Sequence, residues 1–197
     1  MIPVQLASEP DDFDAKVRKP GQQWLAGKGI PPASVPPKFK WNDLWSKCSD
    51  QLHERYSGIC AFSGFYIERV TGARTVEHFQ PKKHYPDLAY EWSNYRLVCS
   101  LLNGSKGDHS DVLDPCTLPA NSFTIDFVTG KVAAHAAAVN LGTQIEATIR
   151  RLKLNREECC KTRIEYLNLV KDGHISADFL QKRSPFVWYE AHRQGLL

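Results

Sequence analysis

TVEHFQPKKHYPDLAYEWSNYRLVCSLLNGSKGD, residues 75–108, is the stretch from which we derive the expected topology. Apolar positions in 74–79 and in 95–98 predict two short strands joined by a loop, and 100–106 predicts a short helix that ends near Gly107. A Glu-His pair stands inside the first strand, and two Asn residues follow nine positions apart. Polar groups of these types, gathered in one short apolar segment, indicate a functional site.

The order strand, loop, strand, helix places these polar residues so that they can act together. Neighbours on a strand point to opposite faces, and the returning helix brings Asn103 over Glu77. Carboxylate and amide oxygens suit Mg²⁺ or Mn²⁺, so we expect these two residues to bind one such ion. His78 is then available as a base on a water, with Asn94 bonded to the loop backbone and fixing the imidazole. Lys106 can reach a phosphate oxygen.

Each of these residues also has a plainer interpretation. A Glu-His dipeptide alone fits an exposed strand. Asn94 fits a turn, and Asn103 fits the end of a helix before Gly104. These structural roles leave function open, because a residue that ends or bridges an element can still contribute to a site.

The segment resembles the HNH endonuclease motif, also called the ββα-metal finger. The acidic-His pair of that family matches Glu77-His78, its central Asn matches Asn94, and its last Asn or His matches Asn103, followed by Lys106-Gly107. The phrases EHF-x-P-K and LAYEWSNYRL are similar to HNH subunits of Septu-type anti-phage systems, including those attached to retrons. The resemblance covers roughly residues 56–170. It implies a metal bound by the acidic residue and the last Asn, with the His as general base.

One departure from the family concerns a structural zinc. Many such proteins carry two Cys-x-x-Cys pairs around the finger, whereas here Cys60 and Cys99 are the only members of those pairs that remain. Two thiolates rarely hold a structural zinc, which takes four ligands, so we expect none. Apolar packing of Phe62, Phe65 and Leu102 is expected to stabilise the finger instead.

Basic residues near the motif form a modest patch. Lys82, Lys83 and Arg96, together with His109, are candidate nucleic-acid contacts. A second basic run at 150–156 fits either a phosphate-tracking helix face or the polar side of an amphipathic helix. The patch near the motif also has an alternative to nucleic-acid binding, namely a solvated face.

Bulk properties limit the class of protein. The chain has 197 residues and a formal net charge of +3, so any binding of nucleic acid must use local clusters of basic residues. It has no apolar run long enough to cross a membrane, and its acidic start does not resemble a secretory signal. We therefore expect a cytoplasmic protein whose six Cys stay reduced.

The fold class expected is α+β, with the finger embedded in a mostly helical body that has an extra β-hairpin. We divide the chain into residues 1–40 with a Pro-rich arm, 41–120 as the nuclease core, and 121–197 as hairpin and C-terminal helices. Other expected elements are a helix in 11–26 interrupted at Pro20-Gly21, a helix in 41–58, an apolar strand in 59–70 with a turn at Ser63-Gly64, and a hairpin in 122–134. Three helical segments follow, with Asn155 as the cap of the second and Pro185 in the first turn of the last.

These observations predict a metal-dependent HNH endonuclease that acts on nucleic acid, with DNA favoured over RNA. The resemblance implies a role in anti-phage defence with an ABC-type ATPase as partner. Two alternatives stay open: an RNase, such as a tRNA-cutting toxin, and a module of HNH type that binds nucleic acid or a partner without cutting.

Overall fold

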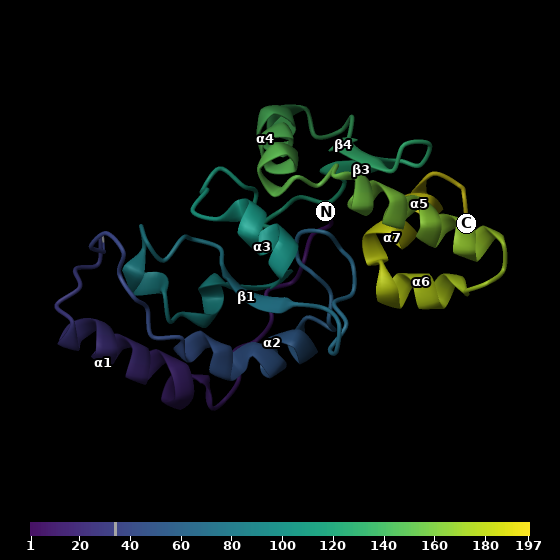
Figure 1. Cartoon of the computed structure of the whole chain (residues 1–197). Coiled ribbons are helices and arrows are strands. Elements are labelled where there is room, and N and C mark those ends of the chain that lie inside the picture. Colours follow the sequence, from purple (N-terminus) through teal and green to yellow (C-terminus); the bar gives the residue numbers. More distant parts are fainter. Residues whose placement is uncertain (34) are drawn as a thin grey trace.

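A pair of antiparallel strands followed by a short helix lies at the centre of the structure, a computed structural model that describes residues 1–33 and 35–197. Strand β1 (Arg74–His78) pairs with β2 (Tyr95–Cys99), and helix α3 (Ser100–Lys106) follows directly. The register aligns Glu77 with Arg96 and His78 with Tyr95. Helices α2 and α3 lie on opposite sides of β1 (Figure 1).

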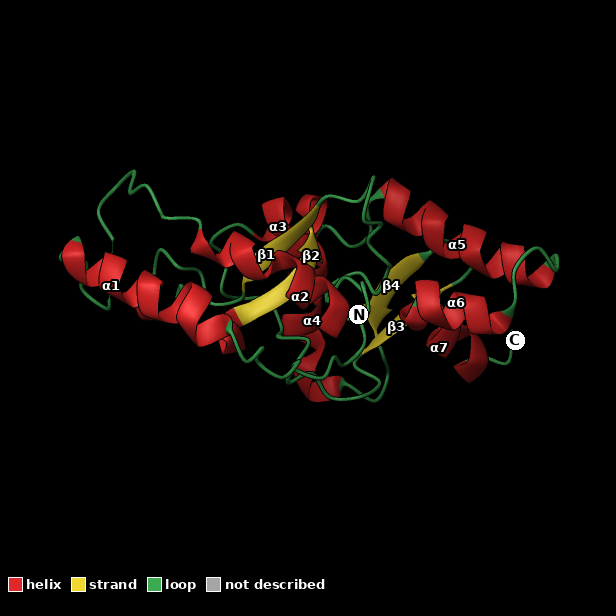
Figure 2. Ribbon diagram, turned by 90° about the horizontal axis from the view of Figure 1, so that it is seen from below, coloured by secondary structure: helices red, strands yellow, loops and turns green. Residues whose placement is uncertain are grey.

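The rest of the chain adds short helices and a second hairpin, so the molecule is α+β with two small antiparallel sheets. Seen from below, α1 lies at one end and α5, α6 and α7 at the other, with β1, β2 and α3 between them (Figure 2). The remaining elements are η1 (Asp14–Arg18), α1 (Lys19–Gly27), η2 (Leu44–Cys48), α2 (Ser49–Arg55), η3 (Pro86–Leu88), η4 (Trp92–Asn94), β3 (Phe123–Asp126), β4 (Lys131–Ala134), η5 (Val139–Leu141), α4 (Gly142–Leu152), α5 (Glu157–Lys171), α6 (Ala177–Arg183) and α7 (Pro185–Arg193).

The central strands carry a large part of the apolar core. Leu97 and Val98 of β2 are fully buried, and so is Tyr95, whose ring packs edge-on against Phe13 at a centroid distance of 5.8 Å. Phe13 is also edge-on to Trp92 at 5.3 Å, so the N-terminal segment contributes to the same core as the motif. Tyr90, Trp92 and Tyr95 are therefore core residues.

Several sequence predictions are confirmed. The strands at 74–78 and 95–99 and the hairpin at 123–134 are present. Helix α3 ends at Lys106, and Gly107 follows with a φ of 50°. Pro185 is in the first turn of α7. None of the helices in the described part of the chain is both long and apolar enough to cross a membrane.

The predicted break at Pro20-Gly21 is wrong. The π-helical turn η1 runs directly into α1, so helical backbone continues through Pro20 and Gly21. Gly21 is needed for packing, because a Cβ there would lie 2.2 Å from Cγ of Tyr90. Ser34, which belongs to the predicted Pro-rich arm, lies outside the described residues.

Three other predictions are also corrected. In residues 59–70 the predicted turn at Ser63-Gly64 is present, since the amide of Gly64 donates to the carbonyl of Cys60 at 2.9 Å. The strand predicted on either side of it is not formed, and the two sides are joined only by an isolated bridge between Ile59 and Tyr66. Asn155 does not cap α5. Its side chain instead bonds both the N–H and the C=O of Val132 at 2.7 and 2.9 Å, which ties β4 to the loop before α5. The predicted helix in 41–58 is present only from residue 44, and its first part is 3₁₀.

The contact between Gly21 and Tyr90 gives a test of how α1 docks. Gly21→Ala should lower the free energy of unfolding by about 1–3 kcal/mol, because the added methyl group meets a buried ring. Gly27→Ala in the same helix is the matched control, since a Cβ added at Gly27 would meet no atom within 4 Å. It should be neutral or gain up to about 1 kcal/mol. Urea unfolding measures both, and equal effects would contradict this docking.

Candidate functional site

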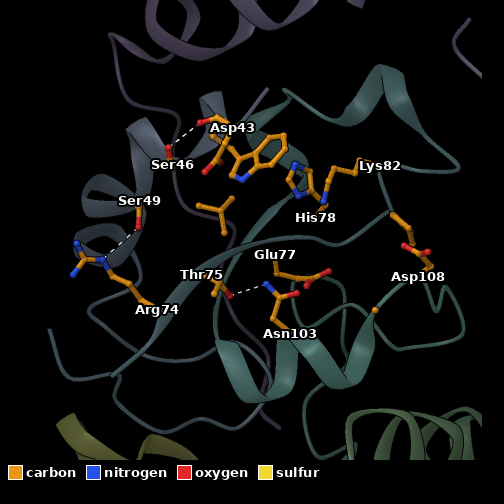
Figure 3. Close-up of a pocket in the computed structure, with 14 residues that line it drawn as sticks. Asp43, Ser46, Ser49, Arg74, Thr75, Glu77, His78, Lys82, Asn103 and Asp108 are labelled. Carbon is orange, nitrogen blue, oxygen red and sulfur yellow. Dashed lines mark hydrogen bonds between the residues drawn. The ribbon is translucent and has the colours of Figure 1, made fainter. Parts of the chain in front are cut away.

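A cavity of about 420 Å³ opens beside β1, and four of the nine predicted site residues line it, namely Glu77, His78, Lys82 and Asn103 (Figure 3). Both faces of the strand contribute to its wall, because β1 is at the edge of a two-stranded sheet. Residues from η2, from the loop after β1 and from the end of α3 complete it. The lining residues are Asp43, Trp45, Ser46, Ser49, Arg74, Thr75, Val76, Glu77, His78, Pro81, Lys82, Asn103, Gly107 and Asp108.

Glu77 is a buried carboxylate with a buried partner. Only 3% of the residue is exposed, and its Oε1 lies 2.8 Å from Nζ of Lys106, which is 0% exposed. The same ammonium donates a hydrogen bond to the carbonyl of His78 at 3.2 Å. Burial raises the pKa of Glu77, and the charge of Lys106 opposes that rise. Lys106 therefore holds Glu77 and the backbone of β1 together, a contact different from the predicted phosphate.

His78 is held in one tautomer. Its Nε2 lies 2.9 Å from the carbonyl oxygen of Ala89, which only accepts hydrogen bonds, so Nε2 carries the proton and Nδ1 keeps its lone pair. The Tyr95 hydroxyl donates to the same carbonyl at 2.8 Å. Burial, followed by the nearby charge of Lys82, lowers the pKa of His78 to about 3. The imidazole is therefore neutral at physiological pH, as a proton acceptor has to be.

Asn94 bonds the loop between the two strands. Its Oδ1 accepts from the N–H of Gln80 at 2.7 Å, and its Nδ2 donates to the carbonyls of Gln80 and Leu88 at 3.0 and 3.1 Å. The carbonyl of Leu88 directly precedes Ala89, the acceptor of His78. Asn94 therefore positions the backbone that orients the imidazole, and its side chain is buried rather than facing the cavity.

Asn103 lies on α3 above the strand residue Thr75. Its Nδ2 donates to Oγ1 of Thr75 at 2.7 Å, and this bond sets the orientation of the amide. Figure 3 shows the amide nitrogen turned to Thr75, with the side chain beside that of Glu77. An amide oxygen and a carboxylate are thus brought to one side of the same cavity.

These two oxygen ligands fit a hard divalent cation. Lys106 contacts one of the two carboxylate oxygens of Glu77, and an amide oxygen adds a neutral ligand. The described residues include no group of three or more His, Cys, Asp or Glu that could hold a metal ion. Water and substrate oxygens would therefore supply the other ligands, and Mg²⁺ commonly keeps several waters.

The predicted basic residues separate into two kinds. Lys82 lines the cavity, Lys83 is exposed and lies 3.4 Å from Asp108 in an ion pair, and His109 is exposed after the end of α3. The prediction that Arg96 contacts nucleic acid is corrected. Arg96 is 4% exposed, and its guanidinium binds both carboxylate oxygens of Asp114 at 3.0 and 2.6 Å, so it cannot contact nucleic acid in this conformation.

Sequence reasoning missed the aromatic wall of the site. The Trp45 ring stands edge-on to the His78 ring at a centroid distance of 4.7 Å, and Nζ of Lys82 lies 5.0 Å from the centroid of Trp45. The helical spacing of Trp41 and Trp45 indicates only helix packing. The signal that could have found them is Lys82 in the loop after β1, because a lysine cation is attracted to the face of a tryptophan ring.

Cys60 and Cys99 are both free thiols. Burial raises the pKa of Cys60, but hydrogen bonds from Cys99 and Ser63 oppose this effect and lower that pKa below its ordinary value. Phe62 and Leu102 are buried in the core, and Phe65 packs on it with its ring stacked on Tyr166 at 6.1 Å. This is the apolar packing that the sequence predicts around the motif.

Comparison with known proteins finds a similarity to a Septu protein. The chain is 31% identical over 80 residues to the Septu protein PtuB of Bacillus thuringiensis. The matched stretch covers 40% of this chain and 31% of PtuB, so less than a third of that protein's length is matched. No protein-family model matches the chain. The similarity supports a relation to Septu proteins.

The buried ion pair can be tested by removing its cation. Lys106→Met should cost about 3–5 kcal/mol of unfolding free energy at pH 7.5, because Glu77 is left charged in a buried place. The loss should be smaller at pH 5 than at pH 7.5, since burial raises the pKa of Glu77 and removal of Lys106 takes away the charge that opposes this rise. Lys83→Met, which removes an exposed cation, should cost less than about 1 kcal/mol at either pH. An equal, pH-independent loss in both variants would contradict the role of Lys106.

The lowered pKa of His78 predicts a stability change with pH. Between its ordinary pKa of 6.5 and about 3, the unfolded chain binds a proton that the folded chain does not, so stability falls as pH falls. In chelator, the free energy of unfolding of the wild type should fall by about 1–2 kcal/mol more than that of His78→Gln between pH 6.5 and 5. One proton contributes at most about 1.4 kcal/mol per pH unit. Urea unfolding at several pH values measures this. The exposed His174→Gln variant is the control, and it should keep the wild-type slope.

Proposed function

We propose that this chain is a metal-dependent endonuclease of the HNH type, which hydrolyses phosphodiester bonds in nucleic acid. The observation that carries the proposal is the β1–β2–α3 unit, in which Glu77 and Asn103 meet across one cavity and His78 presents a neutral imidazole to it. A strand pair followed by a helix is the arrangement that the name ββα-metal describes.

A divalent cation on Glu77 and Asn103 would stabilise negative charge on the phosphate and on the departing oxygen. Thr75 orients the amide for this contact, and Lys106 keeps the carboxylate in place. One support comes from β1 itself and the other from α3, so the ligand positions are set before any ion binds.

His78 accepts the proton of the attacking water at Nδ1. The carbonyl of Ala89 holds the opposite nitrogen, so the imidazole does not need to change tautomer. A pKa of about 3 is low for a base, and one cause is the charge of Lys82. A phosphate bound at Lys82 would oppose that charge and raise the pKa of His78 when substrate is present. Lys82 thus takes the phosphate-binding role that the motif spacing suggests for Lys106.

The similarity to PtuB supports a wider proposal about the setting. We place the chain in a Septu-type anti-phage defence system, where an ABC-type ATPase partner controls when it cuts. DNA is the proposed substrate, with RNA as the alternative. The matched share of PtuB is small, so these points stand as proposals apart from the chemistry of the site.

Purified protein should cut labelled DNA in Mg²⁺ and lose that activity in chelator. His78→Ala should lower the rate by about 10²–10⁴-fold, the usual contribution of a positioned acid or base. His174→Ala, at an exposed position away from the cavity, should cut at the wild-type rate. Glu77→Gln and Asn103→Ala should need more Mg²⁺ for the same rate.

The same assay separates the alternatives. Cleavage of RNA and not DNA would change the substrate class while keeping the mechanism. Cutting by His78→Ala at the wild-type rate would refute the assigned base. Binding of nucleic acid without cleavage of either polymer, in any divalent metal and with the ATPase added, would favour a non-catalytic module.

A further inference from the structure

A second cavity, of about 580 Å³, adjoins the candidate site. It shares Lys82 and Asp108 with the first cavity, so the two are neighbours on one surface. Its volume is within the range of roughly 300–1,000 Å³ that is typical of small-ligand sites. The other lining residues are Val35, Pro36, Pro37, Lys38, Phe39, Trp41 and Lys83.

Aromatic rings form part of its wall. Phe39 and Trp41 meet nearly at right angles, 89°, with centroids 5.1 Å apart. Trp41 is in turn supported by Trp24 and Tyr90, at centroid distances of 6.3 and 6.4 Å. Phe39 and Trp41 are both partly exposed, although helix α1 and the buried ring of Tyr90 lie next to them. The structure therefore holds partly exposed aromatic rings in a fixed position beside the candidate active site.

Positive charge surrounds these rings. Lys38, Lys82 and Lys83 line the cavity with a single acidic residue, Asp108, which pairs with Lys83 at 3.4 Å. Nζ of Lys82 lies 6.0 Å from the centroid of Trp41 and also borders the first cavity. One ammonium thus stands between the aromatic rings and the space proposed for the scissile phosphate.

We propose that this second cavity binds one unpaired base of the substrate strand, next to the phosphate that is cut. The base stacks on Trp41, which Phe39 meets edge-on, and the lysines contact the flanking phosphates. Stacking on an aromatic ring between cationic groups is the usual way in which proteins hold single strands without reading sequence. The inference rests on the proposed nuclease function and adds a substrate class to it.

The geometry favours an unpaired nucleotide over a duplex. A base inside a double helix is covered on both faces by its neighbours, so it can enter a cavity lined by rings only after it leaves the stack. Single strands, loops and bulges present such bases at little cost. We therefore expect single-stranded or locally unpaired nucleic acid to be bound in preference to matched duplex.

Binding in chelator tests the proposal without cleavage. Fluorescence anisotropy with a labelled single strand should show affinity lowered about 5- to 150-fold by Trp41→Leu, which is the range for loss of one stacked base. Trp41→Phe should stay within about threefold of wild type, because it keeps a ring. Trp188→Leu, the same change at a different cavity, should bind as wild type does. Wild type should bind the single strand more tightly than the matched duplex.

Photo-crosslinking of the wild-type protein tests the same contact even where Trp41→Leu fails to fold. A single strand that contains 5-iodouracil should photo-crosslink to wild-type protein at Phe39 or Trp41, as mapped by mass spectrometry. Unchanged affinity in a folded Trp41→Leu protein, or crosslinks only elsewhere, would overturn the proposal. So would binding to a partner protein that depends on Trp41 when nucleic acid binding does not.

The outcomes for the subsite and for the nuclease can be told apart. Mg²⁺-dependent cleavage that needs His78, together with unchanged binding by Trp41→Leu, would keep the nuclease and reject the base subsite. Binding of single strands that depends on Trp41, without cleavage in any metal, would keep the subsite and reject the proposed function.

Discussion

The buried ion pair between Glu77 and Lys106 is the constraint around which the candidate site is arranged. A carboxylate that is 3% exposed carries a large desolvation cost, and a lysine that is 0% exposed carries another. Each charge is tolerated because the other lies 2.8 Å away. Lys106 is the last residue of α3 and Glu77 is in β1, so the pair fixes the end of the helix on the strand. Asn103, three residues earlier on the same helix, is held over the strand as a result.

The edge position of β1 explains how neighbouring residues share one cavity. Glu77 and His78 point to opposite faces of the strand, Glu77 toward α3 and His78 toward Trp45. In a wider sheet, a further strand beside β1 would separate the space on the α3 side of β1 from the space on the Trp45 side. Here the free edge of a two-stranded sheet is the floor of the cavity, so both side chains border it. The charged face and the aromatic face of β1 therefore act on the same space.

Much of this unit could be predicted from the sequence, because its signals are local. Short apolar stretches indicate β1 and β2, and Gly107 marks the end of α3. The loop bonds of Asn94 also follow from local chemistry, since an Asn in a turn bonds nearby backbone groups.

The contacts that were not predicted depend on distant residues. Arg96 is 18 residues from Asp114, and nothing local shows that its guanidinium is used there. A surface position is the ordinary expectation for Lys106 because lysine is seldom buried, and only the folded position of Glu77 changes that. From the local sequence alone, Gly21 resembles a helix breaker. Its packing role depends on the ring of Tyr90, which is far away along the chain, so neighbouring residues do not reveal it.

Lys82 links the two cavities electrostatically. It borders both, its own pKa is lowered first by burial, and its charge contributes to the low pKa of His78. A cation in this position opposes protonation of the imidazole as long as no anion is bound. On the proposed mechanism, the phosphate of a strand that lies across both cavities offsets this charge and strengthens the base. The same strand would then bring its neighbouring base to Trp41, so that substrate binding and activation of His78 depend on one lysine.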